Sequence, residues 1–363
     1  MVPRLNVALV YNMKKDSVGD GSNDGLNDDE DSTHTTSSPT KQEKTNHDTY
    51  AEWDTEDTIL AVKAALEEQH DVTMIEADTD AFQKFLQIQP DIVFNIAEGL
   101  RGPSREAQIP AMLDMLGIPY TGSDPLTLGI CLDKSRAKEI LSHHRIPTPE
   151  FRIITRIDEL QEFTIPFPCI VKPLHEGSSK GVVNASVVKN EAELHEQVTR
   201  VLNNYHEPAL VEKFLSGREF TVALLGNDGD LHVLPIIEIH FNELPEGANP
   251  IYSYEAKWVW DLPDHPIEMY SCPAKVGQEL EQKIIETCRK TFKILNCRDW
   301  CRIDLRLDDA GTPHIIELNP LPGILPNPDE HSAFPMAARA AGISYNEMLC
   351  SVLGHAIRRQ NIN

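Results

Sequence analysis

Short apolar segments alternate with amphipathic helical patterns through the first 121 residues, and this alternation limits the folds open to the chain. Residues 54–69 and 104–116 place apolar side chains at helical spacing. Apolar runs suited to strands stand before and between them, at residues 6–10, 72–76 and 91–95. Strands and helices in such alternation form parallel sheets covered by helices. The sequence therefore predicts an α/β fold that begins with a parallel α/β layer domain over residues 1–121.

One polar stretch, residues 16–49, interrupts this pattern after the first predicted strand. It contains no aromatic residue and carries nine acidic residues against only Lys41 and Lys44. A segment of this composition buries too little apolar surface to offset the entropy lost on ordering. We expect a disordered, solvated insertion; an acidic tract that binds a partner is the alternative.

Charge, hydropathy and cysteine content exclude several classes of protein. Lys and Arg number 33 and Asp and Glu 57, so the formal net charge is −24, which repels nucleic acid. No apolar run approaches the roughly 20 residues that cross a bilayer, so no membrane span is expected. The seven cysteines are odd in number and form no CxxC pair, which favours reduced thiols and a cytoplasmic location.

The remainder of the chain contains strands and helices in a different order. Helices are predicted from residue 133, from residue 190 to about 206, near 275–295 and at 344–358. Strands are predicted at residues 151–154, 169–172, 209–212, 220–225, 233–238, 302–307 and 314–318. The patterns predict two further structural units, over residues 122–206 and 207–363.

Two predicted strands near the C-terminus carry polar side chains in alternation and are separated by a short turn. Residues i and i+2 of a strand share a face, so Arg302 lies with Asp304 and Glu317 lies with Asn319. If the two strands pair as a hairpin, two carboxylates, an amide and a guanidinium converge. Such oxygen ligands suit Mg²⁺. A solvent-exposed face with surface ion pairs is the alternative.

A Gly/Ser-rich loop follows a predicted strand that ends at Lys172. Glycine lets backbone N–H groups approach phosphate oxygens, and Ser178 and Ser179 add hydroxyl donors. The loop matches neither a Walker A motif nor a GxGxxG fingerprint, so an ordinary turn is the alternative. Further along, residues 210–215 alternate charged and apolar side chains, as an adenine-binding edge strand would, and Glu219 follows on the next strand.

Taken in order, these segments resemble the ATP-grasp superfamily and, within it, the D-alanine–D-alanine ligase family. The resemblance covers nearly the whole chain outside residues 16–49. Its most specific motifs are PYTGS at 119–123, LDK at 132–134, IVKP at 170–173, EGSS at 176–179, EKFLSGREF at 212–220, YEAK at 254–257, RID at 302–304, ELN at 317–319 and PMAAR at 335–339. The resemblance implies a two-lobed ATP-grasp fold, with a central lobe over 122–206 and a C-terminal lobe over 207–363.

The resemblance also implies where ATP and metal ions bind. ATP would lie between the two lobes, with its phosphates contacted by Lys134, Lys172 and Lys257. The adenine pocket would be lined by Glu212, Phe214 and Leu215, with Glu219 on the ribose. Two Mg²⁺ ions, with Mn²⁺ as an alternative, would be held by Asp304, Glu317 and Asn319. Ser178 and Ser179 would lie in a loop that closes over the phosphates.

The chemistry implied by the family is ligation of two amino acids through an acyl phosphate. A carboxylate attacks the γ-phosphorus, and an amine then displaces phosphate from the acyl carbon. Arg302 and the N–H of Gly323 would stabilise the oxyanion, Ser178 would take part in the closed site, and Ser332 would hold the second substrate's carboxylate. The partners expected are small amino acids, and the family suggests a homodimer.

The chain departs from the family at the amino-acid end. The glutamate that holds the first substrate's amine should follow the first strand, where no match is visible. Glu98 stands in place of a family histidine, either as an amine ligand or as a turn residue beside Gly99. Trp258 replaces a tyrosine, and residues 324–330 lengthen the second-substrate loop. Arg105 could bind a substrate carboxylate or pair with nearby acids.

Three function hypotheses follow. The first is D-alanine–D-alanine ligation. The second is the same chemistry on a different amino acid or small carboxylic acid, which the changes at Glu98 and Trp258 favour. The third is a non-catalytic nucleotide-binding protein, which is disfavoured because all the metal-site residues are retained. A dinucleotide-dependent dehydrogenase is excluded because no GxGxxG turn follows the first strand.

Overall fold

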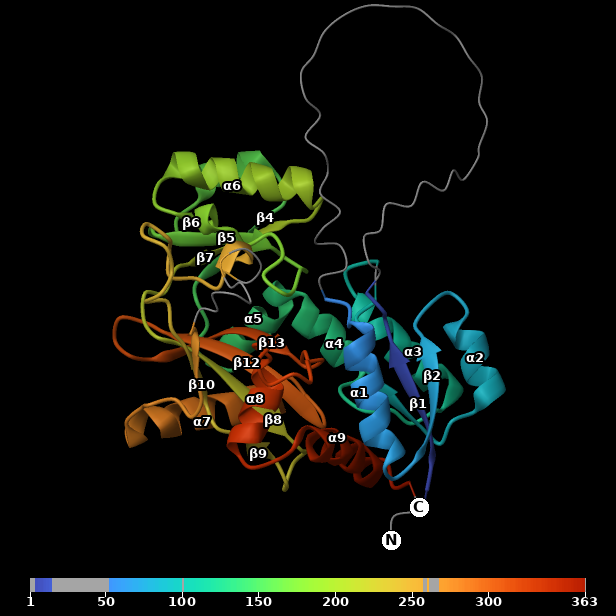
Figure 1. The fold of residues 1–363 in the computed structure, drawn as a ribbon. Helices are drawn as coiled ribbons and strands as arrows, with labels where there is room; N and C mark the ends of the chain where they lie inside the picture. Colours follow the sequence, from blue (N-terminus) through green and yellow to red (C-terminus); the bar gives the residue numbers. More distant parts are fainter. Residues whose placement is uncertain (1–3, 15–51, 100, 257–259, 261–267, 363) are drawn as a thin grey trace, which may run out of the picture.

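The computed structural model describes residues 4–14, 52–99, 101–256, 260 and 268–362. Three β-sheets follow one another along this part of the chain, and helices cover them (Figure 1). The predicted insertion, residues 16–49, lies outside the described residues, as do Lys257 and Trp258. The mixed α/β architecture predicted from the sequence is confirmed.

The N-terminal sheet is parallel, with strand order β2-β1-β3. It consists of β1 (Asn6–Tyr11), β2 (Asp71–Glu76) and β3 (Ile92–Asn95). Strand β1 is central, and four consecutive residues from Val7 to Val10 are completely buried. A run of this kind is expected where helices cover both faces of a sheet. The prediction of a parallel layer in this region is therefore correct.

Helices on each face of the N-terminal sheet supply two separate cores. One face packs against α1 (Glu56–Glu67), which also contacts α9 (Tyr345–Arg359) from the other end of the chain. The other face packs against α2 (Ala81–Ile88) and α3 (Gln108–Leu116), which begins directly after a 3-10 turn (Arg105–Ala107). Helix α2 was not predicted from the sequence. Its short length gives only two buried residues, Ala81 and Phe85, and hence a weak periodic signal.

The central sheet is antiparallel, with strand order β4-β7-β5-β6. Its strands are β4 (Phe151–Ile154), β5 (Cys169–Pro173), β6 (Val187–Val188) and β7 (Ala209–Lys213). Helix α6 (Glu191–Asn204) covers one face and buries Leu194, Val198 and Val201 against the sheet. Strands β5 and β7 carry Lys172 and Glu212, and antiparallel pairing places these two residues diagonally opposite each other on one face of the sheet.

The C-terminal sheet is also antiparallel. Its main strand order is β11-β10-β8-β12-β13, and β9 pairs with β8. The strands are β8 (Glu219–Leu225), β9 (His232–Val233), β10 (Ile237–Ile239), β11 (Tyr270–Ser271), β12 (Trp300–Leu307) and β13 (Pro313–Asn319). The single strand expected at residues 233–238 is therefore wrong, since it is split into β9 and β10. Pro235 lies in the gap, and proline has no N–H to donate to a strand partner.

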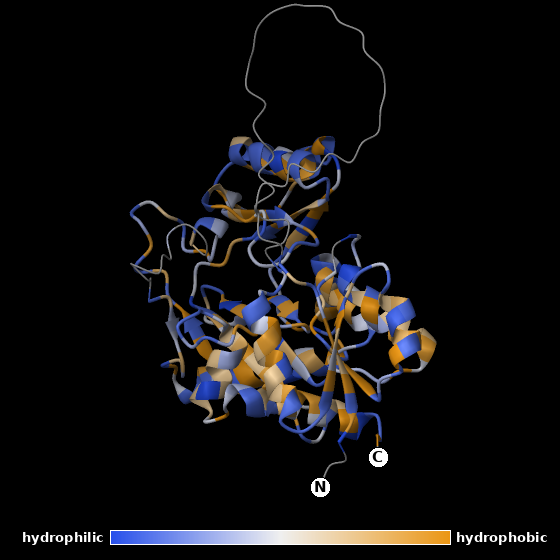
Figure 2. Ribbon diagram, turned by 45° about the vertical axis from the view of Figure 1, so that its right-hand side comes forward, coloured by the Kyte–Doolittle hydropathy of each residue, from blue (hydrophilic) through white to orange (hydrophobic). Residues whose placement is uncertain are grey.

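Five helices pack around the C-terminal sheet and join it to the rest of the molecule. They are α4 (Pro125–Leu132), α5 (Lys134–His143), α7 (Gln278–Ile294), α8 (Ala333–Ala340) and α9. Residues of α5 and α7 share one apolar cluster with the sheet, and residues of α8 and α9 share another. Figure 2 shows that the strands are mostly hydrophobic, whereas the helices carry both hydrophobic and hydrophilic residues. None of the helices in the described ranges has the length and apolar character needed to traverse a bilayer.

The N-terminal and C-terminal sheets are held together by buried contacts. The ring of Trp300 on β12 packs edge-on against Phe94 of β3 at 5.8 Å and Phe334 of α8 at 5.7 Å. Asp299, which is completely buried, accepts a 2.8 Å hydrogen bond from the N–H of Gly122 and pairs with Arg359 at 2.7 Å. These contacts fix the N-terminal sheet against the C-terminal sheet.

Candidate active site

A cavity of about 440 Å³ is lined by strands of the central and C-terminal sheets and by segments that connect the strands and helices of the N-terminal region. Every site residue predicted from the sequence that the structure describes contributes to its lining: Glu98, Lys134, Lys172, Ser178, Ser179, Glu212, Phe214, Leu215, Glu219, Arg302, Asp304, Glu317, Asn319, Gly323 and Ser332. Segments more than 200 residues apart in the sequence thus meet in one place. Lys257 and Trp258 remain predictions, because they lie outside the described residues.

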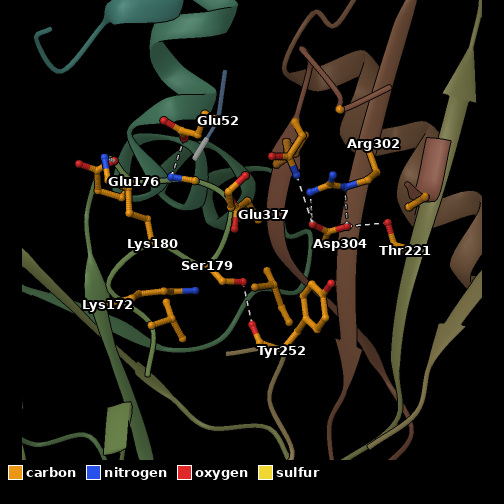
Figure 3. Close-up of a pocket in the computed structure, with 18 of the residues that line it drawn as sticks. Glu52, Lys172, Glu176, Ser179, Lys180, Thr221, Tyr252, Arg302, Asp304 and Glu317 are labelled. Carbon is orange, nitrogen blue, oxygen red and sulfur yellow. Dashed lines mark hydrogen bonds and ion pairs between the residues drawn. The ribbon is translucent and has the colours of Figure 1, made fainter. Parts of the chain in front are cut away.

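The polar hairpin forms one wall of the cavity. Strands β12 and β13 pair so that Arg302 lies opposite Asn319, and Asp304 lies opposite Glu317. The Asp304 carboxylate accepts hydrogen bonds from Arg302 at 3.0 and 3.2 Å, and from Asn319 Nδ2 at 3.2 Å. Thr221 on β8 adds a further 2.6 Å bond to it (Figure 3). The predicted convergence is confirmed, and the alternative of an exposed face is wrong.

The electrostatics of this wall favour a charged Arg302. Burial alone would lower the pKa of its guanidinium, but the charge and hydrogen bonds of Asp304 outweigh burial and raise that pKa. No cluster of three or more carboxylate, imidazole or thiol groups suited to a metal occurs among the described residues. The wall instead combines two carboxylates with one amide, Asn319. This set of oxygen donors, open to a cavity, fits a hard cation that keeps ligands from water or a substrate.

Two lysines that line the cavity are fixed by acidic and backbone partners. Lys134 begins helix α5, whose N-terminus is capped by Asp133. Its Nζ donates a 2.6 Å hydrogen bond to the carbonyl of Glu176 and lies 3.6 Å from Glu317 Oε1. Lys172 ends β5 and forms an ion pair with Glu212. Figure 3 shows Lys172 and the loop on one side of the cavity, facing Arg302 and Asp304 on the other.

Glu212 is held between two buried cations. It is 1% exposed and pairs with both Lys172 and Lys138, which lies one helical turn after Lys134 on α5. Burial would raise the pKa of Glu212, but the two ammonium groups outweigh this and lower it to about 2. Lys138 was not predicted, although its i+4 spacing from Lys134 places both side chains on one helix face.

An apolar and aromatic section lies next to these charges. The guanidinium of Arg306 stacks on the ring of Phe214 at 4.8 Å and donates a 2.9 Å hydrogen bond to Glu219. Leu215 is 7% exposed and completes the apolar surface. Arg306 comes from β12, next to Glu219 in register, so sheet pairing places both partners.

The Gly/Ser loop is held in place by contacts with two other regions. The Oγ of Ser179 donates a 2.7 Å hydrogen bond to the carbonyl of Tyr252, and the N–H of Gly177 donates one of 3.0 Å to Glu52. Ser178 and Ser179 both adopt positive φ, at 50° and 59°. A Cβ added at Gly177 would lie 2.4 Å from Glu52 Oε1, so a side chain at this position would displace the Glu52 carboxylate. The loop is therefore more than an ordinary surface turn.

Glu52 is a site residue that the sequence analysis missed. A glutamate was expected directly after the first strand, but this one follows the polar insertion and precedes α1. It accepts two hydrogen bonds from Arg105, at 2.8 and 2.9 Å, and Arg105 also lies 3.6 Å from Glu176. Arg105 is thus ion-paired, although with Glu52 and Glu176 rather than with Glu106. Searching for an acid just before the first helix would have found Glu52.

Three further carboxylates line the cavity beside Glu52: Asp54, Glu98 and Glu106. None of them forms a side-chain hydrogen bond or ion pair with any residue that the structure describes. Burial raises the pKa of Asp54 to about 7 and that of Glu106 to about 8. Burial, assisted by the neighbouring carboxylates, also raises the pKa of Glu98. Gly99, with φ of 73°, makes the turn, while Glu98 faces the cavity.

The loop between β13 and α8 closes the remaining side. Ser332 is 6% exposed, and its hydroxyl donates to the carbonyl of Gly323 and accepts from the N–H of Leu325, each at 3.1 Å. The hydroxyl proton of Ser332 is thus directed into its own loop. The ring of His331 packs on Tyr270 at 5.0 Å and also lines the cavity.

Comparison with known proteins places this site in a family. Residues 140–354 match the family model described as D-ala D-ala ligase C-terminus. The chain is 38% identical over 308 residues to the uncharacterized protein y4sG of Sinorhizobium fredii, covering 82% of this chain and 87% of that protein. It is 33% identical over 270 residues to the D-alanine–D-alanine ligase of Bordetella petrii, covering 73% and 76%.

Solved structures share the fold. The ATP complex of D-alanine–D-alanine ligase from Bacillus anthracis aligns with a TM-score of 0.67 and 21% identity, over 99% of both chains. VanG D-Ala:D-Ser ligase from Enterococcus faecalis aligns with a TM-score of 0.66 and 19% identity, over 98% of this chain and 100% of that one. The matching family model, the relative at 33% identity and the shared fold lead to one conclusion: the chain belongs to the D-alanine–D-alanine ligase family.

Proposed function

We propose that this protein is an ATP-dependent ligase that joins the carboxyl group of one amino acid to the amine of a second through an acyl phosphate. The observation that carries the proposal is the convergence of Arg302, Asp304 and Glu317 with two lysines, Lys134 and Lys172, around one cavity. In a member of this ligase family, such a set supplies cations for the phosphates and a guanidinium for the reacting carbonyl.

A divalent metal is part of this proposal, because the oxygen donors present fit one. Asp304, Glu317 and the amide oxygen of Asn319 would hold Mg²⁺, as two ions, with Mn²⁺ as an alternative. Bound there, the metal would neutralise charge on the phosphates. Asn319 now donates its amide N–H to Asp304, which leaves its amide oxygen for a ligand.

The nucleotide would be held by residues from both antiparallel sheets. Glu212, Phe214 and Leu215 line the section suited to adenine, and Glu219 lies beside them for the ribose. Lys134, Lys172 and Lys257 would contact the phosphates. Ser178 and Ser179 would close over them from the loop anchored by Glu52 and Tyr252.

The chain's own groups would then act on the two amino acids. Arg302, oriented by Asp304, would donate toward the oxygen that gains charge when the amine attacks, together with the N–H of Gly323. Glu52 or Glu98 would accept the first substrate's ammonium group. The second substrate would lie against Ser332 and its loop. The Ser332 hydroxyl donates its proton to the carbonyl of Gly323. The carboxylate of the second substrate would therefore accept hydrogen bonds from the backbone N–H groups at the start of α8 instead.

D-alanine is the first substrate pair to test, and a different amino acid is the second candidate. The unpaired carboxylates Asp54, Glu98 and Glu106 favour the second candidate, because the single ammonium group of alanine could partner only one of them. The predicted units over residues 1–121, 122–206 and 207–363, a cytoplasmic location and a homodimer are part of the same proposal.

The test is ATP-dependent phosphate release with Mg²⁺ across D- and L-amino acids, with Glu317→Gln as the blank. We expect at least one amino acid to stimulate phosphate release in the wild-type protein and none to do so in the variant. Nucleotide binding, measured by calorimetry, should persist in both proteins. Stimulation that survives Glu317→Gln would contradict the proposed metal role, and a wild-type protein that binds ATP but releases no phosphate with any amino acid would contradict the ligase proposal.

A further inference from the structure

The amino-acid end of the cavity has a wall of unpaired carboxylates, which we call the acidic wall: Asp54, Glu98 and Glu106. The three residues come from separate segments. Asp54 precedes α1, Glu98 follows β3, and Glu106 lies in the 3-10 turn before α3. Each lines the same cavity as Arg302 and Glu317. The fold thus gathers three negative groups where one substrate amine is expected.

The cations nearby do not neutralise the acidic wall. Arg105 is occupied by Glu52 through two hydrogen bonds and lies 3.6 Å from Glu176. Lys180 also pairs with Glu176, at 3.0 Å. The charge of Arg105 acts on Glu98 and Glu106, and that of Lys134 acts on Glu106, but burial and the neighbouring carboxylates outweigh both cations and the pKa of each carboxyl group stays raised. Lys14 lines the cavity as well, and its single charge could balance at most one carboxylate of the wall.

Glu106 is an independent sign that this end holds a ligand. Its side chain lines the cavity, the residue is only 9% exposed, and no described residue donates a hydrogen bond to it or forms an ion pair with it. A buried carboxylate without a partner is expensive, since its desolvation is not compensated within the protein. Groups left in this state inside a cavity commonly meet their partner in a bound molecule.

The protonation of the wall supports the same conclusion. Burial raises the pKa of Asp54 and Glu106 to about 7 and about 8, so without a ligand the wall retains protons near neutral pH. A cation placed against these carboxylates would favour their ionised form. Alanine carries a single ammonium group, which could partner only one carboxylate of the wall.

We propose that the first amino acid, the one whose carboxyl group is activated, carries a second positively charged nitrogen on its side chain, which Glu98 and Glu106 bind. This inference rests on the ligase function proposed above and names its substrate class: diamino acids, of which lysine, ornithine and 2,3-diaminopropionate are probes of decreasing length. The family histidine replaced by Glu98 would repel such a group when protonated, whereas a carboxylate attracts it.

Turnover with matched substrates tests the inference. Phosphate release is measured with the D and L forms of lysine, ornithine and 2,3-diaminopropionate, and with norleucine, which has lysine's aliphatic length without its charge. We expect the best diamino acid to exceed norleucine and alanine in kcat/KM by at least about tenfold. Equal or better turnover of the neutral amino acids would overturn the proposal.

Isosteric variants show which carboxylates cause the preference for a diamino acid. Glu98→Gln and Glu106→Gln keep the shape of the side chain and remove its charge. Glu106→Gln should raise KM for the diamino acid at least about tenfold while changing KM for norleucine less than about twofold, and Glu98→Gln should raise KM for the diamino acid by a larger factor than KM for norleucine. Glu196→Gln, an exposed position on α6, serves as the control and should leave both unchanged. An equal rise in KM for the diamino acid and for norleucine would mean that the acidic wall does not bind the side-chain charge of the substrate.

Direct binding separates failure of this inference from failure of the ligase function. Calorimetry of lysine, ornithine and 2,3-diaminopropionate is run with a non-hydrolysable ATP analogue and Mg²⁺. Binding that depends on Glu98, in a protein that releases no phosphate, would support the acidic wall and refute the ligase function. Turnover of alanine without binding of any diamino acid would refute the inference and leave the ligase function standing.

Discussion

The carboxylates at the two ends of the cavity differ in whether the protein supplies a cationic partner for them. At the end lined by Glu212 and Glu219, each carboxylate has a cationic partner in the protein: Lys138 and Lys172 for the first, and Arg306 for the second. At the other end, Glu98 and Glu106 have no partner among the described residues.

The difference separates two tasks of the cavity: positioning the phosphates of ATP, which all members of the family require, and selecting the amino-acid substrate, which differs between members. Charges balanced within the protein keep lysines and carboxylates in fixed positions whether or not a substrate is bound, as positioning of phosphates requires. Charges left unbalanced need a ligand to complete them, so they define which substrate is preferred. The following predictions test the contrast, beginning with the largest effect.

The largest effect is expected at Asp304. Asp304→Asn removes a charge that orients Arg302 and would hold metal, so ATP-dependent phosphate release should fall at least about a thousandfold. Asp309→Asn is the control on the same hairpin, since Asp309 is exposed and its carboxylate accepts a hydrogen bond from Ser216 at the surface. A loss of less than tenfold for Asp304→Asn would place the chemistry elsewhere in the cavity.

Removing a balanced charge should destabilise the fold. Glu212→Gln leaves Lys138 and Lys172 buried without a counter-charge, and we expect a loss of about 3–5 kcal/mol in the free energy of unfolding. Urea denaturation followed by circular dichroism measures it. Glu98→Gln removes the same charge at the opposite end and should cost less than about 1 kcal/mol. Equal losses for the two variants would abolish the distinction between the ends.

The stability of the fold should respond to pH through His175. His175 lies 3.3 Å from Glu207 and 3.7 Å from Asp133. Burial would lower its pKa, but these carboxylates outweigh burial and raise the pKa to about 9. The raised pKa stabilises the fold fully below about pH 6.5, and this contribution is lost as the pH rises through about 9.

His175→Asn should therefore remove part of the decline in unfolding free energy between about pH 6.5 and 9, amounting to roughly 1–3 kcal/mol. Denaturation at several pH values, compared between variant and wild type, measures this change. His195→Asn, on the outer side of α6, is a control that should leave the profile as it is. Identical pH profiles for His175→Asn and wild type would show that the ion pairs do not contribute to stability.

The smallest effect concerns the pH dependence of the acidic wall. Glu106 has its pKa raised by burial to about 8, so the folded state holds a proton that the unfolded state releases near pH 4.5. The unfolding free energy should therefore fall as the pH rises from about 4.5 to 8, opposite to the usual behaviour of a paired carboxylate. Glu106→Gln should flatten this slope and raise stability at pH 8 by roughly 0.5–2 kcal/mol. An unchanged slope would mean that Glu106 is already neutralised.

Much of the nucleotide end could be predicted because its residues follow local rules. Arg302 with Asp304, and Glu317 with Asn319, share a face through the two-residue repeat of a strand, and the turn between them requires pairing as a hairpin. The strand-end position of Lys172 was visible in the same way. By contrast, Lys138 and Glu52 were missed, since their roles depend on partners from other elements.

The sequence by itself determined the alternation of strands and helices, the polar face of the hairpin and the family to which the chain belongs, because side-chain periodicity and motif order are local properties. Only the tertiary structure decided which charges are neutralised. Glu212 and Glu98 are both acids that follow apolar strands and line the cavity, but Glu212 pairs with two lysines and Glu98 has no partner among the described residues. That outcome depends on distances between segments far apart in the chain, which packing of the three sheets sets and no local pattern specifies.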